Sequence, residues 1–378
     1  MNDKMTRREF LTAAGAAALA AVGAGCAGKA RKASAAAIRF GSPKGIENKL
    51  VVASGTDIEA GILSALKKLG GIGKFVRPGD KVVLKPNGAW AREPGQGATT
   101  NPDVLRVVAL MCKKAGASEV IIVEHTIDRP AAMVLAMSGI SEAARKAGAK
   151  LISAGDESMY GEIAVPKGVI LRKDQVARAV LDADVFITLP VLKTHATTVF
   201  TGTLKNQFGC YPQHNRILLH PKLDHVIVHI NRVLKPRLAI MDAIVGMEGR
   251  GPINGKPREL GVVLGSTDPV ALDATAMRLV GLDPGESGHI KLAAEQGLGS
   301  IEPDDIAIDG PFEECRTQFE PAEKDLPIKM LALISRSRFL TEKLILNPES
   351  FYPLRSAAMV FRQVRDFGLG VLGGRKSS

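Results

Sequence analysis

The sequence is poor in the residues on which several classes of protein depend. Only 4% of its 378 residues are aromatic, and its four cysteines, Cys26, Cys112, Cys210 and Cys315, include no Cys-x-x-Cys pair. Few aromatic side chains leave few platforms on which nucleic-acid bases could stack. Scattered cysteines do not supply the closely grouped ligands of an iron–sulfur cluster or a structural zinc site, so we expect neither.

The net charge of +11 is concentrated at the two ends of the chain. Residues 1–34 carry six basic and two acidic side chains, and residues 321–378 carry ten and five, which leaves +2 for the rest. A nucleic-acid-binding domain would carry its positive charge as a patch on the folded part. We therefore expect no nucleic-acid partner. With 46% hydrophobic and 24% charged residues, the chain can bury a substantial core.

The N-terminus has the pattern of an export signal. Arg7 and Arg8, in the stretch TRREFL, precede a run of small apolar residues. This pattern resembles a twin-arginine signal, and the run is too short and too rich in Ala and Gly to favour a permanent membrane span. Residues 1–35 are thus predicted to be a signal peptide that the twin-arginine export machinery reads, which implies a periplasmic or other extracytoplasmic location. Two processing sites compete: cleavage near Ala35, and lipidation of Cys26, which would anchor the protein to the membrane.

Helix-like and strand-like stretches alternate from about residue 46 onward. Helices are predicted in DIEAGILSALKKLGG, NPDVLRVVALMCKKAGA, SEAARKAGA and DQVARAVLDA, and short apolar strands in DKVVLKPN, EVIIVEHT, KLISAG, DVFITLPVLKTH, PRLAIMDAIVG and ELGVVLGS. This alternation predicts an α/β fold of the doubly wound type, with a mostly parallel sheet and helices on both faces. We expect this domain to span residues 36–315, followed by a basic, partly amphipathic tail over 316–378.

Some polar residues have a simple structural interpretation. Asn101 and Asp268 each precede a proline that opens a helix-like run, so both are predicted to be N-caps. Cys112 lies in an apolar helix-like run and is predicted to be a core residue.

Other polar residues follow the predicted strands, at the point where each strand ends. They are Lys85 and Asn87, Glu124 and His125, Lys193 and His195, and Asp242. In open α/β sheets, ligands bind beyond the carboxyl ends of the strands. The sequence therefore predicts a site at one edge of the sheet. The stretch from Leu192 to Cys210, LKTHATTVFTGTLKNQFGC, lacks apolar periodicity, and we interpret it as a site loop that leaves a strand end.

Three motifs in this part of the chain resemble a known family. LP-x-LKTH, TLKNQFGC and DPVALDA are similar to the exported members of the domain-of-unknown-function 362 family, over roughly residues 46–285. The activity of that family is unsettled. Some of its members add a ferredoxin-like cluster domain, and this chain has no such run of cysteines.

A more distant resemblance is to the nickel-pincer lactate racemase family. His125 and His195 each close a strand, Lys205 lies ten residues after His195, and His220 lies fifteen beyond, in the order and spacing of that family. The resemblance implies that the first two histidines form a proton-transfer pair. It also implies that Lys205 tethers an organometallic cofactor or binds an anion, and that His220 binds nickel or another transition metal.

The sequence also departs from the racemase pattern. KPNGAW stands where those proteins have an Asp-His-Thr-Arg-Pro motif, and Thr203 and Leu204 precede Lys205 in place of a glycine-rich approach. Either difference implies a different cofactor, or none. Lys85, Asn87 and Lys193 are the further candidates for cofactor binding.

We interpret the protein as an exported enzyme, an isomerase or an oxidoreductase, which acts on a small anionic oxygenated substrate by proton or hydride transfer. Two alternatives stay open at this point. One is a non-catalytic exported protein that binds a metal or ligand, and the other is a redox protein related to the ferredoxin-fused members. The tail suits an amphipathic helix on an anionic membrane surface, on a partner subunit, or packed back on the same protein.

Overall fold

The computed structural model describes residues 49–322 except 56, 129, 166–172 and 213–221, together with a few positions between 333 and 353. The chain divides into two units, Met1–Ala36 and Ala37–Ser378, and every described residue belongs to the second. The predicted signal peptide and most of the predicted tail therefore lie outside the described residues. Within the described ranges, no helix has the length and apolar character needed to span a membrane.

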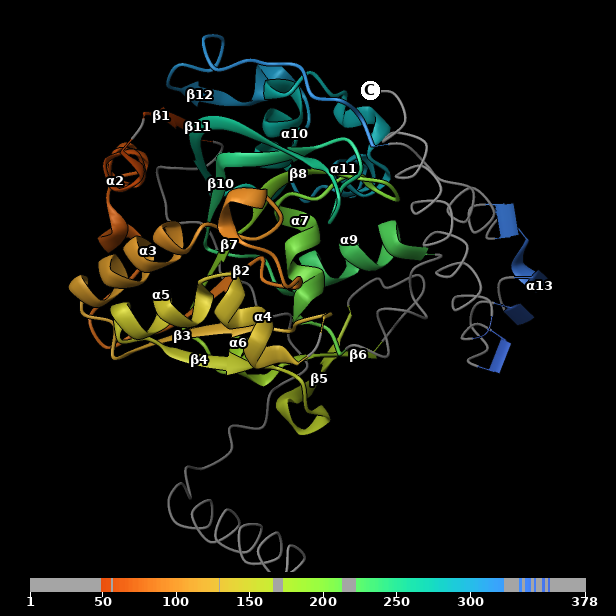
Figure 1. The fold of residues 1–378 in the computed structure, drawn as a ribbon, viewed down its shortest axis with the longest axis horizontal. Helices are drawn as coiled ribbons and strands as arrows, with labels where there is room; N and C mark the ends of the chain where they lie inside the picture. Colours follow the sequence, from red (N-terminus) through yellow and green to blue (C-terminus); the bar gives the residue numbers. More distant parts are fainter. Residues whose placement is uncertain are drawn as a thin grey trace, which may run out of the picture. The chain divides into compact units, whose positions relative to one another are not determined.

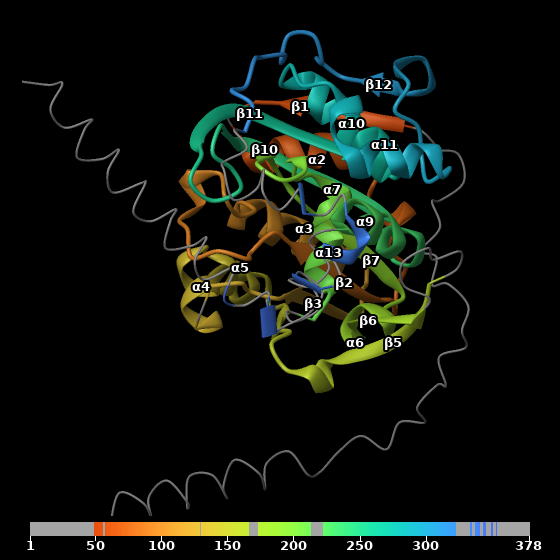
Figure 2. The same cartoon turned by 90° about the vertical axis from the view of Figure 1, so that its right-hand side faces the viewer.

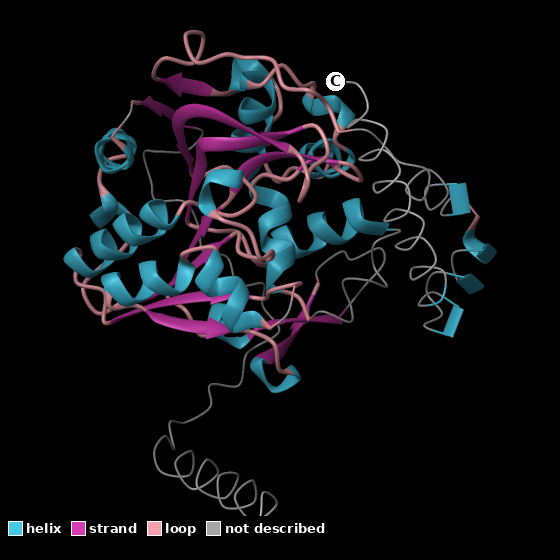
Figure 3. Cartoon of the chain, viewed as in Figure 1, coloured by secondary structure: helices cyan, strands magenta, loops and turns pink. Residues whose placement is uncertain are grey.

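The framework of the described part is a ten-stranded mixed sheet (Figures 1 and 3). Its strands are β1 (Lys49–Ser54), β2 (Lys81–Pro86), β3 (Glu119–Glu124), β4 (Lys150–Ser153), β7 (Val185–Leu189), β8 (Val191–His195), β9 (Val199–Phe200), β10 (Leu238–Glu248), β11 (Lys256–Ser266) and β12 (Ala307–Asp309). The helices are α2 (Ile58–Lys68), α3 (Pro102–Lys114), α4 (Ala131–Met137), α5 (Ile140–Ala147), α6 (Arg178–Leu181), α7 (Thr203–Asn206), α9 (Leu223–Val233), α10 (Pro269–Leu279), α11 (Gly288–Glu295) and the short α13 (Arg338–Leu340). Short 3-10 turns include η4 (Gln207–Cys210) and η6 (Pro284–Glu286).

Most neighbouring strands of this sheet run parallel. The main order is β12-β1-β11-β10-β7-β2-β3-β4, with β8 paired to β10 and β9 paired to β8. β4, β3, β2, β7, β10 and β8 share one direction, whereas β11 is antiparallel to both of its neighbours and β9 is antiparallel to β8. The carboxyl ends of β2, β3 and β8 therefore point to the same edge, as the predicted α/β fold requires.

Helices cover both faces of the sheet, which confirms the doubly wound type. Val82 and Leu84 of β2 belong to a buried cluster that includes apolar residues of α2, α3 and α5, whereas Val83, between them, belongs to a second cluster that includes apolar residues of α9, α10 and α11. Successive side chains of a strand point to opposite faces. All three of these side chains are fully buried, and a strand must therefore be apolar throughout when it lies between two helix layers.

Local signals fix where two of the helices begin. The Asn101 side chain accepts a hydrogen bond from the Asp103 N–H at the start of α3, and Asp268 accepts from the N–H groups of Val270 and Ala271 at the start of α10. Both predicted caps are confirmed. Cys112 is a fully buried core residue of α3, and burial raises the pKa of its thiol to about 12.

The helix predicted in DQVARAVLDA is wrong for its first half. Residues Lys173–Ala177 form strand β6, which pairs antiparallel with β5 (Tyr160–Ala164), and the helix α6 begins only at Arg178 (Figure 2). The pairing with β5 supplies backbone partners that the local sequence does not reveal, so a tertiary contact overrides the helix-like pattern.

The stretch Leu192–Cys210 is also not the loop that we predicted. It contains the end of β8, then β9, α7 and η4, and most of its residues are buried. Its elements are short, and polar hydrogen bonds rather than a periodic apolar face hold them in place. The absence of apolar periodicity therefore did not mean exposure.

Candidate functional site at the carboxyl edge of the sheet

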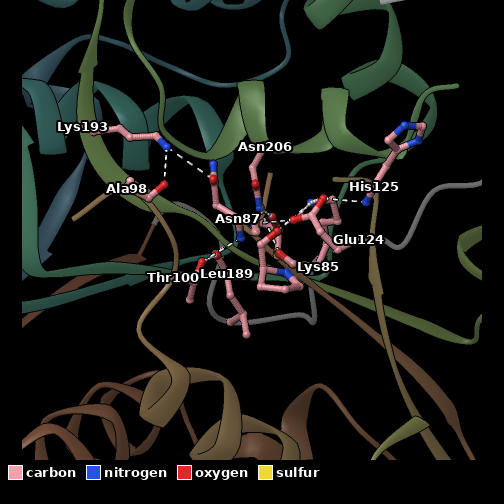
Figure 4. A network of polar contacts seen from close by, with 12 residues as sticks. Lys85, Asn87, Ala98, Thr100, Glu124, His125, Leu189, Lys193 and Asn206 are labelled. Carbon is pink, nitrogen blue, oxygen red and sulfur yellow. Dashed lines mark hydrogen bonds and ion pairs between the residues drawn. The ribbon is translucent and has the colours of Figure 1, made fainter. Parts of the chain in front are cut away.

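The polar residues that follow β2, β3 and β8 come together at one edge of the sheet, as predicted (Figure 4). Lys85 and Asn87 come from the end of β2, Glu124 and His125 from the end of β3, and Lys193 from β8. Apart from Asn87, which is half-buried, the side chains of these residues are at most 3% exposed. Polar groups buried to this degree need partners within the protein, and those partners define what each residue can do.

Lys85 and Glu124 form a buried ion pair at the centre of this edge. The Lys85 Nζ lies 2.9 Å from each carboxylate oxygen of Glu124 and 2.6 Å from the carbonyl oxygen of Pro86. The carboxylate also accepts the backbone N–H groups of Gly88 and His125. An ammonium has three N–H donors, and Lys85 has three acceptors here. A cofactor contact by Lys85 would have to replace one of these bonds.

The chain passes very close to this ion pair at Gly209, in η4. A Cβ atom at Gly209 would lie 2.7 Å from Cε and 2.8 Å from Nζ of Lys85. Any larger residue here would require the Lys85 side chain to shift, and the glycine of the TLKNQFGC motif thus packs the motif directly on the ion pair. In the same motif, the Asn206 amide donates to the carbonyl oxygen of Lys85 and to Thr188 Oγ1, both at 2.9 Å.

Lys193 is a buried lysine with no ion-pair partner among the residues that the structure describes. Its Nζ donates to the carbonyl oxygen of Ala98 at 2.5 Å and to Asn87 Oδ1 at 3.4 Å. The pKa of Lys193 is lowered to about 7, mainly by burial and also by the charges of Lys205 and Lys85, against the opposing charge of Glu124. The depressed pKa follows from removing an ammonium from water without an adjacent counter-charge.

His125 is held by Tyr160 of β5. The Nδ1 atom of His125 lies 2.6 Å from the Tyr160 hydroxyl, which also lies 2.6 Å from the carbonyl oxygen of Ala154. A carbonyl can only accept, so the single hydroxyl proton of Tyr160 points to Ala154, and the hydroxyl oxygen accepts from Nδ1–H of His125. In the neutral imidazole this bond places the proton on Nδ1 and the lone pair on Nε2.

His195, at the end of β8, has the opposite arrangement. Its Nδ1 accepts the backbone N–H groups of Thr197 at 3.0 Å and Thr198 at 3.3 Å. Nδ1 cannot hold a proton without breaking these bonds, so the proton of the neutral ring is on Nε2. The side chain is 7% exposed. The two histidines that we predicted as a pair therefore present chemically different Nε2 atoms.

Lys205 lies in α7, whose start is fixed by Asp273 of α10. The fully buried carboxylate of Asp273 accepts the N–H groups of Thr203 at 2.5 Å and Leu204 at 2.9 Å. Gly202, with φ 53°, makes room for this carboxylate, which a Cβ atom there would contact. Burial raises the pKa of Asp273 to about 7, against the lowering effect of the two N–H donors. Lys205 itself is half-buried.

The predicted metal ligand His220 lies outside the described residues. Among the residues that the structure describes, no group of three or more His, Cys, Asp or Glu side chains is arranged to hold a metal ion. The charge of Lys205 acts on Lys193 and on one imidazole, His289, among the described residues. The metal-binding role of His220 stays a prediction.

Three residues of the site were missed by the sequence reasoning. They are Tyr160, which fixes the His125 ring, Asn206, which ties α7 to β2 and β7, and Asp273, which holds the start of α7. A carboxylate within the apolar run of DPVALDATAM and an amide within TLKNQFGC were visible signals. Nothing in the local sequence marks Tyr160.

The chain combines a mixed α/β fold with a cluster of buried polar residues at the carboxyl edge of its sheet. Residues 82–278 match the model of the family described as Domain of unknown function (DUF362). The chain belongs to this family, as its motifs predicted, although the match is narrower than the expected 46–285. It is also similar to the thylakoid-associated protein sll1697 of Synechocystis sp. (strain PCC 6803), with 33% identity over 251 residues, 64% of this chain and 74% of that protein.

Two solved structures are similar at lower levels. The lactate racemase apoprotein from Thermoanaerobacterium thermosaccharolyticum has 13% identity and a TM-score of 0.39, and the similarity covers 59% of this chain and 55% of that one. A protein from Thermotoga maritima has 13% identity and a TM-score of 0.33, with 64% and 60% coverage. The chain thus spans little more than half the length of these proteins, and such values say nothing about its activity.

Proposed function

We propose that this protein is an enzyme that moves a proton on a small anionic oxygenated substrate, with His125 as the base and His195 as a hydrogen-bond donor to a substrate oxygen. One observation carries the proposal: the hydrogen bonds at Nδ1 give the two imidazoles opposite tautomers. Both residues follow parallel strands whose carboxyl ends share one edge of the sheet.

The opposite tautomers of His125 and His195 support a different role for each residue. A neutral imidazole with its lone pair on Nε2 can take a proton, and the imidazolium that forms at His125 keeps its bond from Nδ1–H to Tyr160. His195 cannot take a proton at Nδ1, because two backbone N–H groups already point at that atom. Its Nε2–H can instead polarise a carbonyl or stabilise the oxyanion that appears when the proton leaves the substrate. Return of the proton from His125 to a different atom of the substrate anion completes an isomerisation with no net change in the protein, whereas return to the original carbon gives only exchange with solvent.

Two lysines favour a negatively charged substrate. Lys193 is buried without an ion-pair partner among the described residues, and Lys205 is close enough for its charge to lower the pKa of Lys193. Lys85 is neutralised by Glu124. A carboxylate or another small anion near Lys193 would offset the repulsion between Lys193 and Lys205.

The resemblance to the racemase family implies a cofactor tethered to Lys205. When bound, such a cofactor would supply a hydride acceptor. The roles assigned to His125 and His195 do not depend on it. The intact mass of the mature protein, purified gently from its native host, tests this part of the proposal. An adduct on Lys205 would support the tether, and the mass of the processed terminus would show whether the twin-arginine signal is removed and whether Cys26 is lipidated.

The proposed chemistry is tested by hydrogen exchange. The protein is incubated in D₂O with a panel of 2-hydroxy and 2-oxo acids, and loss of carbon-bound protons is followed by NMR. We expect exchange that falls about 100-fold or more in His125→Gln and in His195→Gln. His225→Gln, a change of a half-buried histidine of α9, is the matched control and should retain the rate.

Two results would count against the proposal. Exchange that persists in His125→Gln would remove the assigned base. Saturable anion binding without exchange of any substrate would favour the alternative of a non-catalytic ligand-binding protein.

A further inference from the structure

A third imidazole, His289, lies in the first turn of α11, beyond the part of the chain that matches the family model. Its side chain is fully buried. The predicted pair of histidines did not include it. Its two ring nitrogens differ in their surroundings: Nδ1 has a hydrogen-bond partner, and Nε2 has none among the described residues.

The Nδ1 atom of His289 carries the ring proton. It lies 3.1 Å from Ser287 Oγ and 3.7 Å from a carboxylate oxygen of Asp224, at the start of α9. The Ser287 hydroxyl donates to the carbonyl oxygen of Thr198 at 3.2 Å, so its oxygen accepts from His289. A lone pair on Nδ1 would also face the Asp224 carboxylate, which is unfavourable.

The Nε2 atom therefore carries a lone pair, and it is buried with no hydrogen-bond partner among the described residues. Burial lowers the pKa of His289; Asp224 raises it, and the charge of Lys205 lowers it again. A neutral, buried acceptor without a donor is unusual, because buried polar groups are nearly always satisfied. A ligand that donates a hydrogen bond would satisfy it.

The connections of His289 lead to the proposed site. The carbonyl oxygen of Thr198 accepts from Ser287, and the N–H of the same residue donates to Nδ1 of His195. The two imidazoles are thus linked through the backbone of one residue. Lys205 is the second connection, because its charge acts on both His289 and Lys193.

We propose that His289 is a specificity-determining residue whose Nε2 accepts a hydrogen bond from a hydroxyl group of the ligand. Together with Lys193 and Lys205, it selects a hydroxylated anion over an anion of the same charge without the hydroxyl. An ammonium donor on the ligand is disfavoured by the charge of Lys205, which acts on His289. The inference rests on the proposed function and narrows its substrate class.

The experiment compares two anions that differ by one hydroxyl, glycolate and acetate. Binding to the full chain is measured by calorimetry for the wild type, His289→Phe and His289→Gln. We expect the wild type to bind glycolate at least about tenfold more tightly than acetate, since a site built around a ligand hydroxyl discriminates strongly against its absence. His289→Phe should bind the two equally, and His289→Gln should recover part of the preference, because its amide oxygen can accept.

A second measurement does not depend on variants that fold. Nitrogen NMR of ring-labelled histidine in the wild type should show His289 with its proton on Nδ1, and a change at Nε2 when glycolate but not acetate is added. A proton on Nε2, an unchanged preference in His289→Phe, or no binding of either anion would each overturn the assignment.

The two proposals fail separately. His125→Gln should abolish exchange and keep the preference for glycolate, whereas His289→Phe should remove the preference. If the preference exists and no exchange is found, the ligand class stands and the proton-transfer chemistry does not.

Discussion

Replacing Glu124 with glutamine should strongly destabilise the protein, because it leaves the ammonium of Lys85 buried without its counter-charge. Both side chains of this pair are 2% exposed. Removing one partner of a buried ion pair typically costs about 3–5 kcal/mol of the free energy of unfolding. The amide oxygen of the introduced glutamine would still accept one backbone N–H, but its NH₂ group would face either Lys85 or the other N–H donor. We therefore expect a loss within that range for Glu124→Gln.

The assay is urea denaturation followed by circular dichroism, with the midpoint expected to fall and the slope to stay constant. Two comparisons separate the buried charge from other effects. Glu142→Gln breaks an exposed pair with Arg145, whose side chains are 50% and 71% exposed, and should change the midpoint little. The double change Lys85→Met with Glu124→Gln removes both charges and should recover most of the loss.

Either of two results would refute this reasoning. One is a loss in Glu124→Gln no larger than in Glu142→Gln, which would mean that Lys85 finds water or another acceptor. The other is a double variant no more stable than the single one, which would mean that the loss comes from the backbone N–H groups of Gly88 and His125 rather than from the charge.

Three further predictions concern stability. The pKa of Asp273 is raised to about 7 from an ordinary 3.8, so its contribution to the free energy of unfolding is complete below about pH 4 and is lost as the pH rises through 7. The free energy of unfolding of the wild type minus that of Asp273→Asn should therefore fall between these pH values. A difference that does not change with pH would contradict a buried carboxyl at this position. The lowered pKa of Lys193, about 7 against 10.5, has the opposite sign, so the difference between the wild type and Lys193→Met should rise between about pH 7 and 10 in the same urea titrations. Gly209→Ala should cost about 1–3 kcal/mol through overpacking against Lys85; Gly95→Ala, where a Cβ atom meets nothing within 4 Å, is the control, and equal thermal midpoints for the two variants would show that Lys85 moves aside freely.

The export signal and the membrane contact of the tail stay predictions, because the N-terminus and most of the tail lie outside the described residues. The twin-arginine signal rests on TRREFL, and the membrane contact of the tail rests on its arginines and apolar residues. Partition of the full chain to anionic vesicles, compared with a chain that ends at residue 320, would decide the second. Equal partition would dispose of the membrane contact.

The local sequence was sufficient to predict several features of the fold. These features are the apolar strands between two helix layers, the caps at Asn101 and Asp268, and the gathering of polar residues at the carboxyl ends of β2, β3 and β8. The first half of DQVARAVLDA failed because its partner, β5, is a separate strand that no local pattern announces.

The sequence by itself therefore indicated that Lys85, Glu124 and Lys193 lie at the carboxyl ends of their strands, but not that Tyr160, Asn206 and Asp273 hold the neighbouring residues in place. Only the tertiary structure decided their chemistry. His125 and His195 are the same residue type at corresponding strand ends, yet Tyr160, 35 residues away, puts the proton on Nδ1 of one, and the turn after β8 puts it on Nε2 of the other. The bond from Ser287 to Thr198 joins residues 89 positions apart and links His289 to the same site. The ring nitrogen that carries the proton of a neutral histidine is determined by the donors and acceptors around the ring, and tertiary packing rather than local sequence places these groups.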